Sequence, residues 1–261
     1  MVEFSFIKEF DEGDVHLGAL ASGADPADAA TERPGLTVIG AWAFEGALGV
    51  LAMANAAQEG ATVGEVALRR HGPIPPRGQL HGHATLLGTW DLGPMALLRV
   101  HVGFSTPSGA PVAEATLGFY LHGRGGFGGE RPPRSPRSPL PDRQPDRTLP
   151  VNILGDAAER YSLLGDRNPI HLHPDAAAAW PALTQGRPIL HGLGGVALVE
   201  RALANAEAAP IASLRCRLSR PIWPGDALTL ETWRNGAARQ LRLRRGEEDV
   251  WSDAGAEIGA D

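Results

Sequence analysis

One short segment of this chain carries the residue types that proton transfer to a small substrate requires. Residues 161–176 read YSLLGDRNPIHLHPDA, where a carboxylate (Asp166), a carboxamide (Asn168) and an imidazole (His171) stand beside Pro169. Proline fixes its own φ and pushes the preceding residue out of the α region, so these side chains do not share one regular helix. They lie on a turn, from which side chains at i, i+2 and i+5 can converge on one point.

The aspartate and the histidine of this turn could act as an acid–base pair. Their ordinary pKa values are roughly 3.9 and 6.5, and burial would move both toward usefulness near neutral pH. The other interpretation is a solvated turn in which the aspartate and the asparagine cap a following helix.

The composition is that of a soluble globular protein. Of the 261 residues, 43% are apolar and 21% are charged, and no uninterrupted apolar run approaches the ~18 residues of a membrane span. The first residues, MVEFSFIKEFDEGD, are acidic where a signal peptide would be basic. We therefore expect a cytoplasmic protein that has no membrane partner.

Charge and cysteine content argue against two further classes. The formal net charge is −6, whereas nucleic-acid binding calls for a basic surface, so no nucleic-acid partner is expected. The single cysteine, Cys216, cannot form an internal disulfide. It alternates with Leu214 and Leu218 on one face of an expected strand, which indicates a core residue.

A proline-rich segment divides the chain. Residues 130–150 hold seven prolines and almost nothing that could fill a core. At about 3.1 Å per residue, such a segment can extend some 60 Å and cross the face of a domain. The sequence predicts a first unit over residues 1–129, a linker over 130–150 and a second unit over 151–261.

Each unit shows a helix followed by strands. Apolar periodicity predicts helices over 42–58 in the first unit and over 193–206 in the second. Strands are expected over 79–87, 95–105, 111–121, 211–220, 227–234, 240–245 and 249–258. Asn235-Gly236 is typical of a hairpin turn. One helix packed on an antiparallel sheet, twice over, is an α+β arrangement.

The turn at 161–171 resembles a family signature. Its order of tyrosine, a short step to Gly-Asp-x-Asn-Pro, an aliphatic residue and histidine, followed by PILHGL at 188–193, is similar to that of MaoC-like type 2 (R-specific) enoyl-CoA hydratases and dehydratases. Residues 123–131 and 220–226 look like two glycine-containing stretches of the hydratase part of peroxisomal multifunctional enzyme type 2. The resemblance is strongest over residues 150–236 and weak over the first 70.

This resemblance implies a double hotdog fold, in which two curved antiparallel sheets each wrap a central helix and the two units pair. In such enzymes the first unit has lost the catalytic turn, and residues 1–129 contain no Gly-Asp-x-Asn-Pro element. The resemblance therefore implies one active site per chain, with a degenerate first unit that accommodates the acyl tail.

The implied reaction is the reversible hydration of trans-2-enoyl-CoA to (3R)-3-hydroxyacyl-CoA, without a metal or a resident cofactor. The resemblance assigns Asp166 and His171 to an acid–base dyad, in which His171 and Asn168 hold the water and Asp166 exchanges a proton with the α-carbon. Which of the two is the acid stays open. The implied oxyanion donor is the backbone N–H of Gly192, at the start of the second expected helix, where N–H groups are free.

Four more residues are expected to contact the substrate. Tyr161 is either a core aromatic or a pocket wall, and His191 adjoins the implied oxyanion donor. Leu164 replaces the small residue usual in the family and could either crowd the turn or narrow the acyl pocket. Arg187 is either a contact for the phosphates of coenzyme A or a solvated surface residue.

Other functions stay open. The histidines at 171, 173 and 191, with Asp175, could instead hold a metal. A second enzymatic alternative is a dehydratase acting on carrier-protein-bound 3-hydroxyacyl thioesters in fatty-acid or polyketide assembly. A non-catalytic hotdog protein that binds acyl thioesters is the alternative of another class. Hotdog sheets usually pair, so we expect a homodimer whose partner molecule is an acyl-CoA or acyl-carrier-protein thioester.

Overall fold

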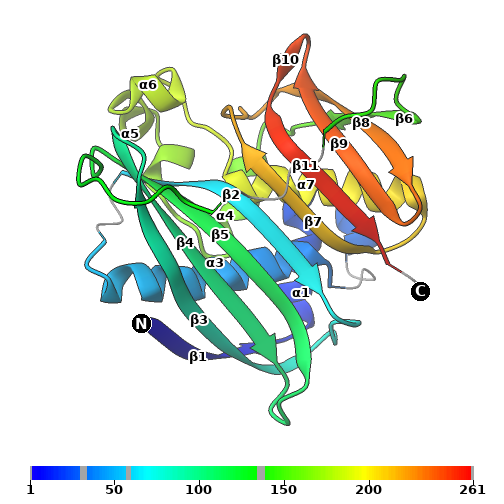
Figure 1. Cartoon of the computed structure of the whole chain (residues 1–261). Helices are drawn as coiled ribbons and strands as arrows, with labels where there is room; N and C mark the ends of the chain where they lie inside the picture. The colour runs from blue at the N-terminus through cyan, green and yellow to red at the C-terminus, as the bar shows by residue number, and fades with distance from the viewer. Residues whose placement is uncertain (1, 30–33, 57–59, 134–138, 260–261) are drawn as a thin grey trace.

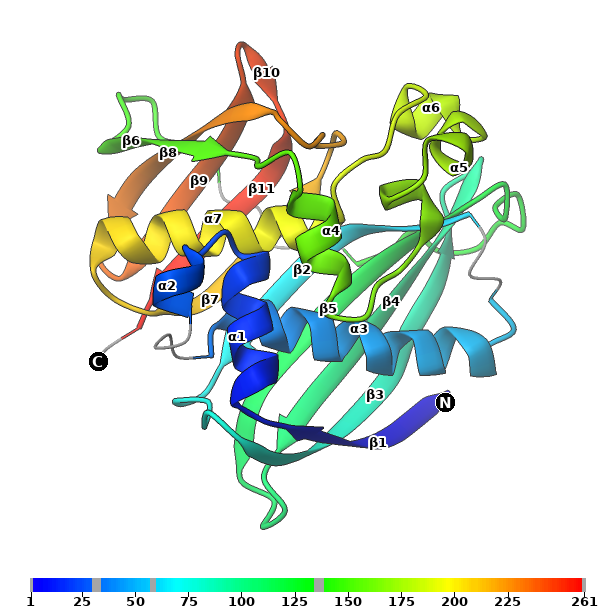
Figure 2. The same cartoon turned by 180° about the vertical axis from the view of Figure 1, so that it is seen from behind.

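Two long helices lie against the same face of one curved antiparallel sheet (Figures 1 and 2). The computed structural model describes residues 2–29, 34–56, 60–133 and 139–259. The strands before the linker are β1 (Glu3–Phe10), β2 (Ala61–Arg70), β3 (Gly78–Asp91), β4 (Met95–Ser105) and β5 (Pro111–His122). Those after it are β6 (Arg147–Asn152), β7 (Ile211–Leu218), β8 (Ala227–Asn235), β9 (Ala238–Arg245), β10 (Glu248–Asp249) and β11 (Trp251–Ile258). Their order in the sheet is β1-β3-β4-β5-β2-β7-β11-β9-β8-β6, and β10 pairs with β9.

The central helices are α3 (Leu36–Met53) and α7 (Gly192–Glu207). The bounds of α7 agree with the predicted 193–206 to within one residue at each end. Helix α3 begins six residues before the predicted 42–58 and ends at Met53, before the predicted end. The chain leaves α3 through Asn55, whose φ of 50° does not continue a right-handed helix. Residues 57–58 of the predicted helix lie outside the described residues.

The helix α3 is long and apolar enough to cross a membrane by length and composition, but 67% of it is buried inside the protein. Its side chains pack on β3, β4 and β5 and against α7. Burial in the core therefore accounts for its apolar sequence.

Short helices cover the open side of the central pair (Figure 2). They are α1 (Glu12–Ala21), α2 (Pro26–Ala29) and α4 (Ala157–Ser162), while α5 (Pro174–Ala178) and α6 (Pro181–Thr184) project at one end of the sheet. A 3₁₀ turn spans Pro169–His171. The predictions missed β1, β2 and α1. The alternation of Phe4 and Phe6 in β1 is a period-two signal that could have revealed that strand.

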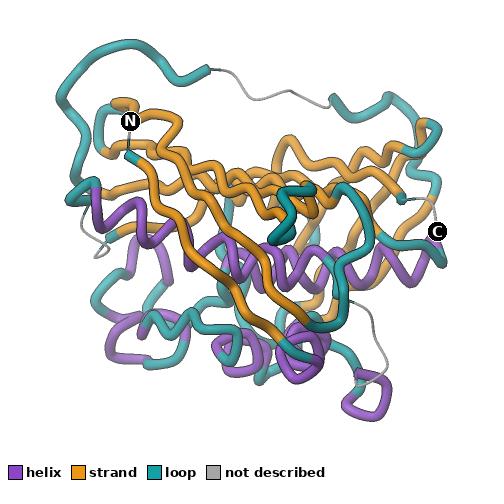
Figure 3. Tube along the Cα trace, turned by 90° about the horizontal axis from the view of Figure 1, so that it is seen from below, coloured by secondary structure: helices purple, strands orange, loops and turns teal. Residues whose placement is uncertain are grey.

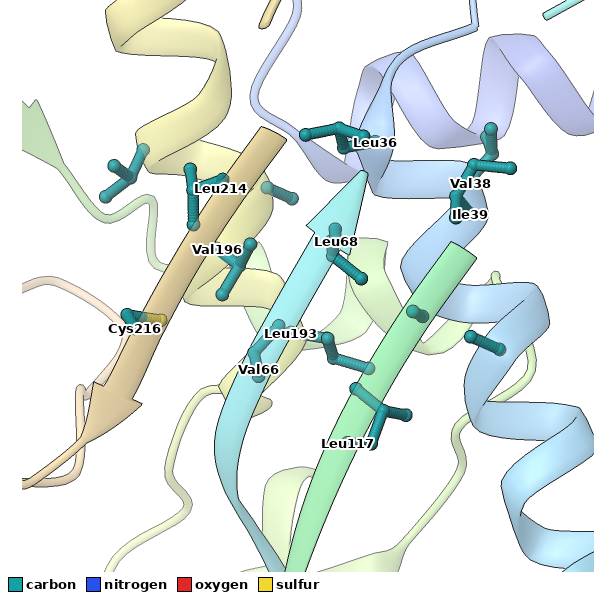
Figure 4. Close-up of a cluster of buried hydrophobic side chains, with 14 of the residues drawn as sticks. Leu36, Val38, Ile39, Val66, Leu68, Leu117, Leu193, Val196, Leu214 and Cys216 are labelled. Atoms are coloured by element: carbon teal, nitrogen blue, oxygen red, sulfur yellow. The ribbon is translucent and has the colours of Figure 1, made fainter. Parts of the chain in front are cut away.

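One apolar core runs through both halves of the molecule. Figure 4 shows side chains of α3 and α7 meeting those of β2, β5 and β7. Cys216 is 5% exposed on β7, as its alternation with two leucines predicted. The antiparallel hairpin at Asn235 and Gly236 is confirmed, because β8 ends at Asn235 and pairs with β9.

The two halves join by direct pairing of β2 with β7. The register runs from Glu65 opposite Arg217 to Arg69 opposite Ser213. Glu65 also forms ion pairs of 2.7 Å with Arg99 of β4 and 3.0 Å with Arg217. Backbone hydrogen bonds and this charge cluster therefore hold the halves in one register.

The described parts of the proline-rich linker, residues 130–133 and 139–146, lie over the face of the sheet opposite the helices (Figure 3). Its main-chain carbonyls accept hydrogen bonds from Arg99 (to Pro133, 2.8 Å), Gln240 (to Pro139, 2.6 Å) and Trp233 (to Arg143, 2.9 Å). Residues 147–150, expected as linker, are instead the beginning of β6, because their backbone pairs with β8. Residues 134–138 lie outside the described part of the chain.

Candidate active site

The turn that carries Asp166 and Asn168 is built by its own side chains. The carboxylate of Asp166 accepts a hydrogen bond of 3.1 Å from the N–H of Asn168, and the amide oxygen of Asn168 accepts one of 3.2 Å from the N–H of Ile170. Gly165 has a φ of 113°, which a side chain would strain. Asn168 thus caps the 3₁₀ turn that follows, as the capping interpretation predicted. This capping role is compatible with the other interpretation, in which the side chains of the turn converge on one site.

His171 presents one defined nitrogen to its surroundings. Its ring is 9% exposed, and Nδ1 lies 2.9 Å from the carbonyl oxygen of Ile189. Because a carbonyl can only accept, Nδ1 carries the proton and Nε2 keeps its lone pair in the neutral ring. Burial lowers the pKa of His171, while the Asp166 carboxylate and this hydrogen bond oppose the shift. The imidazole is therefore held neutral with Nε2 as a proton acceptor.

Asp166 lies close to this ring. A carboxylate oxygen of Asp166 and one nitrogen each of His171 and His191 lie within 4.8 Å of one another. Burial raises the pKa of Asp166, and the nearby His171 and the N–H of Asn168 oppose that shift. The pKa of Asp166 is thus raised and that of His171 lowered, which brings the two values closer together. The pair can therefore share one proton.

His191 stacks on His171 with ring centroids 3.8 Å apart and planes at 30°. Its Nε2 donates a hydrogen bond of 2.9 Å to the main-chain carbonyl of Asp166. Lone pairs lie in the ring planes, and two planes that stack in this way do not direct their nitrogens at a common point about 2.1 Å from each. His173 and Asp175 are exposed. The geometry favours a proton-transfer site over the metal site considered above.

Gly192 is the first residue of α7, with His191 as the residue before the helix. The first N–H groups of a helix have no acceptor within it and lie at the positive end of its dipole. A Cβ at Gly192 would lie 2.5 Å from Cδ1 of Leu218. The glycine is therefore needed for the close packing of Leu218 against a helix end whose free N–H groups could bind a negative oxygen.

A cavity of about 920 Å³ begins at these groups and extends into the first half. Its polar end is lined by Asp166, Asn168, His171, His191 and Gly192. Its apolar wall includes Phe44, Leu48 and Leu51 of α3 and Phe119 of β5. Such a shape suits a molecule with a reactive polar centre and an apolar tail.

The structure places three expected substrate contacts away from this cavity. Tyr161 is 2% exposed in the core with its ring 4.9 Å from that of His191, and Leu164 packs against the same core. Arg187 stacks over Trp223, with its guanidinium carbon 4.3 Å from the ring centroid. Among the four residues expected to contact the substrate, His191 alone lines the cavity. For Tyr161 the structure thus shows the core alternative, and for Arg187 it shows the surface alternative, of the two that the sequence left open.

Sequence reasoning also missed residues that line the cavity. Phe44 and Phe119 face each other with ring centroids 6.1 Å apart. Trp180 lies beside the ring of His122 and over Gly60. No local motif marks these side chains, because they reach the cavity only through the packing of α3, β5 and α6.

Known proteins are similar to this chain in sequence. Residues 137–254 match the model of the MaoC like domain. Enoyl-CoA hydratase ChsH3 of Mycobacterium tuberculosis is 35% identical over 170 residues, which are 63% of this chain and 57% of that protein. The 3-hydroxyacyl-thioester dehydratase Y of the same organism is 34% identical over 186 residues, 68% of this chain and 63% of that protein. The chain thus spans less than two thirds of the length of these relatives.

The fold has relatives among solved structures. A MaoC-like dehydratase from Phytophthora capsici matches with a TM-score of 0.83 at 22% identity, over 99% of this chain and 95% of that chain. The α+β hotdog architecture expected from the sequence is thereby confirmed. This chain therefore carries a MaoC-like domain, and its fold is the hotdog fold of MaoC-like proteins.

Proposed function

We propose that this protein is a hydro-lyase that reversibly adds water to the double bond of a trans-2-enoyl-CoA and forms the (3R)-3-hydroxyacyl-CoA. The observation that carries the proposal is the meeting of Asp166 and His171 at the polar end of an apolar cavity. The names of the two curated relatives support the same reaction class. The R configuration rests on the family resemblance.

Hydration requires one group that takes a proton from water and another that gives a proton to the α-carbon. A pair that holds a single proton satisfies this requirement, because one member is then an acid while the other is a base. Nε2 of His171 is the free acceptor, and Asn168 lines the same end of the cavity. We assign the water to His171 and Asn168, and the exchange with the α-carbon to Asp166. The proton taken from water stays on His171 until the pair is reset.

The thioester oxygen gains negative charge as water adds. The N–H of Gly192 at the beginning of α7 is the donor proposed for this oxygen, since a free helix N–H and the helix dipole both stabilise an anion. Loss of one such donor commonly costs on the order of 10²- to 10³-fold in rate.

The substrate's two ends are assigned to the two ends of the cavity. The wall of Phe44, Leu48, Leu51 and Phe119 would hold the acyl tail, which is the role proposed for the degenerate first half, residues 1–129. Arg167 and Arg220 are exposed residues of the lining and would meet the phosphates of coenzyme A. The steps use groups of this chain alone, so no resident cofactor is proposed.

The test is loss of enoyl-thioester ultraviolet absorbance over a panel of acyl lengths, with the product resolved on a chiral column. Asp166→Asn and His171→Gln are each expected to lower kcat by at least about 10²-fold with unchanged circular dichroism. The matched control, Asp175→Asn, alters an exposed carboxylate on the same segment and is expected to keep wild-type activity. Equal rates in wild type and both dyad variants would overturn the proposal.

A dehydratase for carrier-protein thioesters is the second candidate; the name of 3-hydroxyacyl-thioester dehydratase Y supports a dehydratase of acyl thioesters, and that name fits coenzyme A and a carrier protein equally. The double variant Arg167→Ala, Arg220→Ala tests whether the acyl group is bound as a coenzyme A thioester or as a carrier-protein thioester. For a coenzyme A enzyme it should raise KM for the CoA thioester and leave that for the short pantetheine thioester unchanged. If the carrier-bound thioester is the better substrate and the variant changes KM for neither small thioester, the enzyme acts on carrier-protein thioesters.

The non-catalytic binding protein would bind these thioesters without turning them over, and the same absorbance assay addresses it. The expected homodimer and cytoplasmic location stay predictions.

A further inference from the structure

We infer that His191 is a positioning residue for the acid–base pair, which holds the ring of His171 by stacking and the main chain of Asp166 by a hydrogen bond. The activity readout of this inference rests on the proposed function, but its spectroscopic readout does not. The role differs from the substrate contact expected from the sequence.

The first support is the stack between the two imidazoles. The ring of His191 is 1% exposed, and its centroid lies 3.8 Å from that of His171. His171 is otherwise held at Nδ1 by the carbonyl of Ile189, which is a single contact about which the ring could swing. A flat partner on the ring face removes that freedom, so Nε2 keeps its direction toward the cavity.

The second support is the hydrogen bond to Asp166. Nε2 of His191 lies 2.9 Å from the main-chain oxygen of Asp166, which can only accept. The bond fixes the peptide plane at the residue whose side chain is proposed to exchange the proton. Since Asp166 and His191 are 25 residues apart in sequence, this contact joins the catalytic turn to the beginning of α7.

The third support comes from what surrounds His191 itself. Its ring also contacts the buried ring of Tyr161 at 4.9 Å, so the imidazole is itself held in place. Its remaining nitrogen, Nδ1, is buried and has no hydrogen-bond partner among the described residues. A substrate-binding histidine would present that nitrogen to the cavity. The next residue is Gly192, so one side chain aligns the base, the acid and the proposed oxyanion donor.

Two substitutions separate the stack from the bond. His191→Phe keeps a flat ring but loses the donor to Asp166, whereas His191→Gln keeps an N–H donor but has no ring. Each is expected to lower kcat by about 10- to 100-fold with little change in KM, since a misplacement near 1 Å can cost 10²-fold. His173→Phe and His173→Gln are matched controls, because His173 is exposed and makes no side-chain cap.

The pH behaviour of His171 distinguishes positioning from a merely structural role. The groups that act on His171 are the Asp166 carboxylate, the Ile189 carbonyl and the ring of His191, with Tyr161 behind. Loss of the ring in His191→Gln admits water to the face of His171. The protonation midpoint of His171, followed by NMR of its ring protons in the free protein, should then rise toward the ordinary histidine value. In His191→Phe that face stays covered and the midpoint should move less.

The outcomes are distinct. If wild type turns over no thioester, the proposed function fails, and the NMR titration alone then decides the inference. If both variants keep the wild-type kcat and the His171 midpoint, His191 positions nothing and the inference is overturned. If both lose only melting temperature, with kcat per folded molecule and midpoints unchanged, the residue is structural and the inference is likewise overturned.

Discussion

The carboxylate of Glu200, on α7, accepts a hydrogen bond of 2.6 Å from the main-chain N–H of Leu36, the first residue of α3. It also accepts one of 2.8 Å from the hydroxyl of Thr37. The residue before α3 is Gly35, which has no side chain to cap the helix. One central helix is therefore capped by a side chain of the other, 164 residues away.

Removal of this cap is expected to destabilise the whole molecule. Glu200→Ala leaves a buried N–H and a buried hydroxyl without acceptors, which we expect to cost about 1–3 kcal/mol of unfolding free energy. Burial raises the pKa of Glu200, and its bonds to Thr37 and Leu36 oppose that shift. Because the substitution also removes the cost of burying this carboxyl group, the loss of unfolding free energy should be smaller than the sum for two isolated hydrogen bonds. Urea unfolding beside the exposed control Glu159→Ala measures the difference. An unchanged midpoint would contradict the capping role.

Stability should fall on mild acidification because of the buried histidines. Burial lowers the pKa of His191 to about 2, so below about pH 6.5 the unfolded chain binds a proton there and the folded one does not. Stability is fully present above the unfolded pKa and falls at up to about 1.4 kcal/mol per pH unit below it. Lowering of the His171 pKa acts in the same direction, and the raised pKa of Asp166 acts in the opposite one.

The measurement is urea unfolding between pH 7 and pH 5. In wild type, unfolding between pH 7 and pH 5 takes up a proton at His191, and in His191→Gln it does not. The slope of unfolding free energy against pH should therefore be shallower in the variant by the contribution of about one proton. An identical slope in this variant and in wild type would show that folding does not lower the pKa of His191.

The ring pair of Phe44 and Phe119 should limit the acyl tail. Phe44→Ala opens the apolar wall of the cavity, so kcat/KM should rise for long or branched acyl groups relative to short ones, by about 1–3 kcal/mol in discrimination. Phe127→Ala changes a phenylalanine that is 55% exposed and outside the cavity lining, and should leave the ratio unchanged. A chain-length profile that Phe44→Ala does not alter would place the tail elsewhere.

Gly192→Ala should lower kcat strongly and lower thermal stability only slightly. The added methyl group meets the end of the Leu218 side chain, which can move. Leu218→Ala in the same chain removes that clash, so the double variant separates crowding from the loss of close approach to the N–H. Restored thermal stability with kcat still low is expected. Full recovery of kcat in the double variant would show that Gly192 serves packing alone.

The sequence predicts well what local chemistry decides. Pro169 and Gly165 impose the turn on their own neighbours, and Asn235-Gly236 imposes the hairpin. The alternation around Cys216 likewise reports which face of β7 is buried. In these places the structure follows from a few adjacent residues.

Elsewhere distant contacts decide. The beginning of α3 depends on Glu200, which no pattern near residue 36 reveals. The strand β2 reads ATVGEVALRR, whose alanine, glutamate and arginine content suits a helix, and it is extended because β5 and β7 pair with its two edges. The sequence left Arg187 open as a phosphate contact or a surface residue, and its exposed position is set by the aromatic face of Trp223, on which Arg245 also stacks.

The ladder between β2 and β7 has a consequence for the integrity of the molecule. Either half made alone would display a long unpaired edge strand, and such edges recruit other chains. Each half thus pairs with the edge strand of the other and prevents that strand from aggregating. A break in the peptide chain within the overlying linker would leave this pairing in place, so a nicked protein should stay associated and fold as one body.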